Sequence, residues 1–108
     1  MAIKKGKEKL LRYNGTVEDA MNHSLEALKK GGFKSIERND SLQQLNAKFN
    51  NIFAVGTIDL ALSKSGKGTT IAIKSKSHVD NVYALFRSPN DKIINSFSEN
   101  MRNWVEPF

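Results

Sequence analysis

The sequence predicts an α+β fold: a single domain with an antiparallel meander of four to five strands and two amphipathic helices on one face. Three observations predict this fold. Apolar and polar residues alternate with a period of two over residues 42–49, 53–63 and 69–77, as in strands with one dry and one wet face. Turn-forming residues separate these segments at even spacing. Apolar residues recur at helical spacing in segments near both ends of the chain.

The first two elements are a strand and a helix. Residues 8–14 predict a strand that ends at an Asn14-Gly15 turn. Thr16 and Asp19 have the spacing of a capping box, so the helix is expected to begin at Val17. Gly31-Gly32 predicts its end, and His23 falls on its polar side. One stripe of the helix is expected to face the core: Val17, Ala20, Met21, Ser24, Leu25 and Leu28.

Four more strands are expected to follow, over residues 33–38, 42–49, 53–63 and 69–77. Asn39-Asp40, Asn50-Asn51 and the segment SKSGKG supply the three turns between them. In the last strand the dry face is expected to carry Thr69, Ile71, Ile73, Ser75 and Ser77. The wet face is expected to carry Lys74, Lys76 and His78.

Helical patterns close the chain. Val79–Phe86 predicts about two turns, and Ser88 with Pro89 predicts the start of a longer helix. That helix is expected to bury Ile93, Ile94, Phe97, Met101, Trp104 and Val105.

The resulting β-α-β-β-β-β-α order resembles the TATA-binding-protein-like architecture. The stretches GTTIAIKSKS and VYALFRSPNDKI also resemble those of small uncharacterised bacterial and phage domains, a resemblance that implies no activity.

Length and charge limit the possible functions. A chain of 108 residues suits one domain, expected over residues 7–108 after a flexible basic tail at 1–6. Residues 1–12 carry five basic groups and one acidic group, so they hold +4 of the net charge of +6. The remaining body is too weakly basic for a dedicated duplex binder. With no secretory signal or membrane-spanning segment in the sequence, a soluble cytoplasmic protein is expected.

Local motifs predict no catalytic, metal or cofactor site. Without cysteine there is no disulfide or thiol nucleophile, and His23 and His78 lack metal-ligand spacing. The SKSGKG segment precedes a strand, so it predicts a hairpin and no phosphate loop. Ser77 and His78 point to opposite sides of a strand and cannot act together with Asp80. The prediction is therefore a non-enzymatic binding or accessory domain of unknown partner.

Two alternative functions remain open at this stage, and the oligomeric state is also open. One is weak contact with nucleic acid or an anionic surface through the tail and last strand. Its candidate residues are Lys4, Lys5, Lys7, Lys9, Lys48, Lys74, Lys76 and His78. The other is an apolar, lipid-like ligand held between helices and sheet. Its candidate residues are Met21, Leu25, Phe97, Met101 and Trp104.

Overall fold

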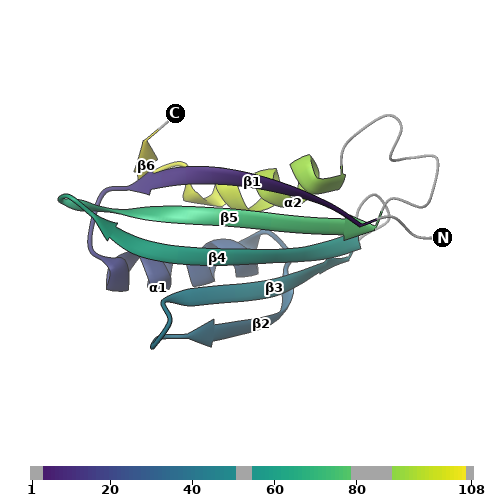
Figure 1. Ribbon diagram of the computed structural model, residues 1–108, viewed down its shortest axis with the longest axis horizontal. Coiled ribbons are helices and arrows are strands. Elements are labelled where there is room, and N and C mark those ends of the chain that lie inside the picture. The colour runs from purple at the N-terminus through teal and green to yellow at the C-terminus, as the bar shows by residue number, and fades with distance from the viewer. Residues whose placement is uncertain (1–3, 51–54, 79–88, 107–108) are drawn as a thin grey trace.

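Antiparallel strands form one sheet, and both helices pack against the same face of it (Figure 1). The computed structural model describes residues 4–50, 55–78 and 89–106. Its elements are β1 (Lys4–Tyr13), α1 (Val17–Lys30), β2 (Lys34–Asn39), β3 (Gln44–Asn50), β4 (Val55–Ser65), β5 (Gly68–His78), α2 (Pro89–Ser98), the 3₁₀ turn η2 (Glu99–Met101) and β6 (Val105–Glu106). The sheet order is β2-β3-β4-β5-β1-β6, which confirms the predicted α+β fold class.

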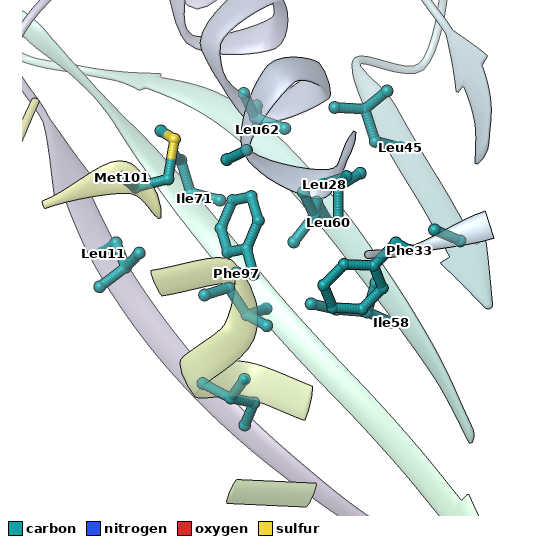
Figure 2. Packing of buried hydrophobic residues seen from close by; sticks show 14 of the residues in the cluster. Leu11, Leu28, Phe33, Leu45, Ile58, Leu60, Leu62, Ile71, Phe97 and Met101 are labelled. Carbon is teal, nitrogen blue, oxygen red and sulfur yellow. The ribbon is translucent and has the colours of Figure 1, made fainter. Parts of the chain in front are cut away.

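The predicted alternation of faces is confirmed in the central strands. Ile71 and Ile73 of β5 are buried beneath the helices, whereas Lys74 and Lys76 are exposed on the opposite face, called here the open face. The β4–β5 turn is the predicted hairpin, because Ser65 pairs with Gly68 and Gly66 takes a φ of +59°. The core lies between the helices and the covered face (Figure 2).

The inner side of α1 carries small residues, and a glycine at its end lies close to α2. Ala20, Ser24 and Ala27 are fully or almost fully buried on the inner stripe of α1. At the end of the helix, a Cβ added to Gly31 would lie 2.6 Å from the backbone oxygen of Ser96 in α2. A side chain at Gly31 would push the end of α1 away from α2, so this glycine sets the spacing of the two helices there.

The first strand begins earlier than the sequence indicates. β1 starts at Lys4, inside the segment expected to be a flexible tail, and not at residue 8. It pairs with β5 along its whole length without a register shift, so that Lys4 lies opposite His78 and Tyr13 lies opposite Thr69. Lysine-rich sequence has a low intrinsic strand preference, but a continuous ladder with a long neighbouring strand overrides that preference.

The C-terminal segment corrects a second prediction. Pro89 begins α2 as expected, but the helix ends at Ser98 and does not continue to Val105. A 3₁₀ turn follows, and Val105 instead pairs with Tyr13 as part of β6. The backbone of Trp104 accepts a hydrogen bond from the Asn14 N–H at 3.1 Å. Pairing with β1 therefore outweighs the helical periodicity of this segment.

Two predicted features lie outside the described residues: the short helix at Val79–Phe86 and the Asn51 half of the β3–β4 turn. Over the ranges that the structure describes, no helix has the length and apolar character that crossing a membrane requires.

Candidate functional site

The basic residues proposed for anion binding do not form one patch. Lys48 and Lys76 are exposed on the open face, where both pair in register with Thr57. Lys7 and Lys9 instead fall on the helix-covered side of β1, because they pair with Ser75 and Ile73 of the covered face. Lys4 and Lys5 lie in β1, and His78 ends β5, but the structure describes only the backbone of these three residues.

Acidic neighbours further dilute this basic character. Lys74 Nζ lies 3.4 Å from Glu8 Oε1, and Lys74 is also the register partner of Asp59. Lys7 forms an ion pair with Asp91 of α2. Binding of nucleic acid or an anionic surface stays a prediction from the sequence, which salt-dependent binding would test.

The residues proposed for an apolar cleft belong to one continuous core. Met21, Phe97 and Met101 are each at most 2% exposed, and Leu25 and Trp104 are partly buried against them. Figure 2 shows Phe97 and Met101 directed into this core among Ile71, Leu60 and Leu62. Met21 has a second role, because it also lines a groove at the surface.

This groove, called here the α1–hairpin groove, lies between the first half of α1 and the β2–β3 connection. Its volume is about 350 Å³. Figure 1 shows the β2–β3 connection and the start of α1 at the same end of the molecule. The lining residues are Val17, Glu18 and Met21 from α1, with Arg38, Asp40 and Gln43 from β2 and the connection.

Local structure fixes both walls of the groove. On the helix side, Thr16 caps α1 by accepting a 3.1 Å hydrogen bond from the Asp19 N–H, which sets the direction of the first turn. On the hairpin side, Gln43 has a φ of +55°, and its carbonyl accepts a hydrogen bond from the Leu62 N–H at 2.9 Å. The connection is therefore anchored to β4 as well as to its own strands.

Arg38 is held in place across the groove. Its Nε donates to Asp40 Oδ1 at 2.7 Å, and its Nη1 donates to Asn22 Oδ1 of α1 at 2.8 Å. A guanidinium with two fixed hydrogen bonds has lost most of its rotamer freedom before any ligand arrives. Arg38 thus links the hairpin to the helix and keeps the groove in one shape.

The charge of the groove is opposite to that of the chain. The lining holds two carboxylates, Glu18 and Asp40, and one guanidinium, Arg38, so it carries −1 on a chain of +6. Val17 provides partly exposed apolar surface beside these groups, and the almost fully buried Met21 also lines the groove. An apolar floor beside excess negative charge suits a molecule that has both an apolar body and a positive end.

A second cluster joins Tyr13 of β1, His23 of α1 and Trp104 of the C-terminal segment. The Tyr13 hydroxyl and His23 Nδ1 form a hydrogen bond, and the His23 ring stacks on Trp104 with centroids 4.4 Å apart. Sequence reasoning placed His23 on the polar surface, whereas it is half-buried here. No spacing signal could reveal this cluster, because its members come from three separate elements. Among the described residues, no three His, Asp or Glu side chains could together hold a metal ion.

Tyr13 should make the stability of the protein depend on pH. Burial, with a smaller contribution from the charge of Asp19, raises the pKa of Tyr13 above its usual value of 10.0. The folded state then holds the phenolic proton more tightly than the unfolded state does. The associated stability is present below about pH 10 and is lost as pH rises through the folded pKa.

We expect Tyr13→Phe to lower the free energy of unfolding by about 1 kcal/mol at neutral pH, because the hydrogen bond to His23 is lost. The gap between wild type and variant should shrink above about pH 10. Urea denaturation at a series of pH values measures this difference in the free energy of unfolding. A gap that stays constant through this range would show that the Tyr13 hydroxyl is not perturbed by folding.

Comparison with known proteins gives structural neighbours only. No protein-family model matches the sequence, and none of the curated proteins matches it. Truncated norcoclaurine synthase from Thalictrum flavum aligns with a TM-score of 0.61 at 10% identity, covering 93% of this chain and 92% of that chain. The same synthase with dopamine and hydroxybenzaldehyde gives 0.55 at 10% identity, covering 94% and 88%. The di-domain ARO/CYC StfQ of the steffimycin biosynthetic pathway gives 0.56 at 10% identity, covering 93% of this chain and 49% of that chain. This chain therefore has a helix-grip-like α+β fold.

These neighbours contradict the prediction that the chain is not an enzyme. Norcoclaurine synthase and the aromatase/cyclase are enzymes that share its fold. The prediction rested on the lack of local catalytic motifs in the sequence. That reasoning was wrong, because a fold can bring side chains together from positions that are distant along the chain, as the Tyr13–His23 hydrogen bond illustrates.

Proposed function

We propose that this chain binds a small amphipathic cation, such as an arylalkyl or alkyl amine, in the α1–hairpin groove. The observation that carries the proposal is the lining of the groove: net negative charge beside the apolar side chains of Val17 and Met21. Its volume of about 350 Å³ suits one small molecule. The fold is compatible with such a ligand, since one structural neighbour holds dopamine, an arylethylamine, together with an aldehyde.

The groups of the groove have separate roles in this proposal. Val17, with a small contribution from the almost fully buried Met21, contacts the apolar body of the ligand, and Glu18 receives the ammonium group. Among the described residues, Glu18 has no ion-pair partner, so its charge is available. Asp40 is already shared with Arg38, so it contributes less to ligand binding. The proposed setting is cytoplasmic, as the sequence predicts.

Three matched probes test the charge requirement. Phenethylamine, phenethyl alcohol and phenylpropionate share an aryl body and carry positive, zero and negative charge. We expect the amine to bind with a Kd of roughly 1 mM, as suits a small ligand in an open groove. Its binding should shift the backbone NMR signals of residues 17–21 and 38–43. The alcohol should bind more weakly, and the carboxylate should bind weakest.

Glu18→Gln should weaken amine binding about two- to fivefold, the size expected for one partly exposed charge pair. Glu26→Gln is the matched control, because Glu26 is exposed on the same helix but does not line the groove. Equal binding of the three probes, signal changes outside the groove, or equal effects of the two variants would contradict the proposal.

A further inference from the structure

Most of the outer edge of β1 carries no partner strand among the described residues. On one side, β1 pairs with β5 along its whole length, from Lys4 to Tyr13. On the other side, only Arg12 and Tyr13 pair with β6. Figure 1 shows β1 at the margin of the sheet, with β6 beyond it at one end. The remaining margin, Lys4–Leu11, is called here the β1 edge.

The backbone groups on the β1 edge follow from those at its end. The Asn14 N–H points toward the β6 side, where it bonds to Trp104, and the Tyr13 carbonyl faces Gly68 in β5. Because the register has no shift, backbone direction alternates along the strand. Gly6, Glu8 and Leu10 therefore direct their N–H and C=O groups away from β5, as a template for another strand. β6 shows that this margin accepts a strand.

Charge disfavours a second copy of β1 as the occupant. Lys7 and Lys9 share one face of the strand. In an antiparallel pair of two such strands, these lysines would lie opposite one another, and like charges in that position are destabilising. The edge carries Lys4, Lys5, Lys7 and Lys9 against a single acidic residue, Glu8. An acidic partner strand would remove this repulsion and gain attraction instead.

The two faces of β1 specify an alternating pattern in the partner. Lys7 and Lys9 are exposed at the margin of the helix-covered face, and the Lys7–Asp91 ion pair is about half exposed, so exchanging it costs little. On the open face, Leu10 is 56% exposed, which is unusual for a large apolar side chain. A paired strand would set acidic side chains beside the lysines and apolar ones beside Leu10.

We propose that the β1 edge docks an extended segment of a partner protein in which acidic and apolar residues alternate. The segment adds a strand to the sheet through backbone hydrogen bonds, and the lysines select its charge. This surface is separate from the α1–hairpin groove, so docking and ligand binding are independent properties.

The test uses a short blocked peptide of alternating glutamate and valine, labelled for fluorescence anisotropy. We expect it to bind, and NMR should place it on β1. A peptide with valine and lysine alternating should bind at least about tenfold more weakly. The same acidic peptide with alternate backbone nitrogens methylated keeps its charge but loses donors, and it should also lose at least about tenfold.

Variants complete the design. Lys9→Glu should weaken the acidic peptide about tenfold, whereas Lys64→Glu makes the same charge change on an exposed residue of β4 and should have at most a twofold effect. Circular dichroism checks that both variants fold. No binding, equal binding of the methylated peptide, equal binding of the lysine peptide or equal effects of the two variants would each overturn the proposal.

Discussion

Phe97→Ala should lower the free energy of unfolding by about 3–5 kcal/mol, the typical cost of removing a buried aromatic ring. Phe97 has no exposed surface. Figure 2 shows its ring among Ile71 of β5, Leu60 of β4 and Leu28 of α1. Phe97 therefore joins α2 both to the sheet and to α1. Domains of this size are stable by about 5–15 kcal/mol, so the variant should lose a large part of its stability.

Urea denaturation followed by circular dichroism measures this loss, and Leu42→Ala is the control. Leu42 is 62% exposed, so its truncation should change stability by no more than about 0.5 kcal/mol. A cost below about 1 kcal/mol for Phe97→Ala would mean that α2 does not pack on the sheet as described.

The sheet and its two faces could be predicted because the alternation of apolar and polar residues along a strand fixes which side chains face the core. In β5, a shift of one residue would bury Lys74 and Lys76 and expose Ile71 and Ile73, so only one assignment of the faces is stable. The stripe on α1 is just as restrictive. Sequence periodicity therefore predicts which residues meet in the core, which is most of what defines the fold class.

The secondary structure at the ends of the chain could not be predicted from the sequence, because it depends on pairing with strands that are distant in sequence. Val105 continues a helical stripe in the sequence, yet it pairs with Tyr13 in the sheet. Lys4 and Lys5 read as a solvated tail, yet they extend the ladder with β5. In both places a strand edge offers backbone hydrogen bonds that local preference cannot anticipate.

The candidate site was even less visible in the sequence. Met21 was singled out, but as part of an internal cleft and not of a surface groove. Glu18 is a favourable residue at a helix start, and Arg38 is an ordinary charge on an edge strand. They become a candidate site only because the fold brings the start of α1 to the β2–β3 connection.

Gly56→Ala should be as damaging as Phe97→Ala, although it adds only one methyl group. Gly56 is buried in β4 beneath α2. A Cβ at this position would lie 2.1 Å from the Lys76 carbonyl oxygen of β5 and 2.9 Å from Ile93 Cδ1 of α2. The oxygen belongs to the neighbouring backbone and cannot turn away, so we expect a loss of about 3 kcal/mol or more, or failure to fold.

Two further variants separate the causes of this loss in the same urea denaturation experiment. Gly32→Ala is the control for backbone strain, because Gly32 has a φ of +84° and no atom within 4 Å of an added Cβ. It should cost only about 1–2 kcal/mol. Ile93→Val removes Cδ1 and relieves the contact with α2, but it leaves the Lys76 oxygen in place. The double variant Gly56→Ala with Ile93→Val should therefore stay unstable. Recovery of stability in the double variant would show that α2, and not the close approach of β4 to β5, is what requires glycine at this position.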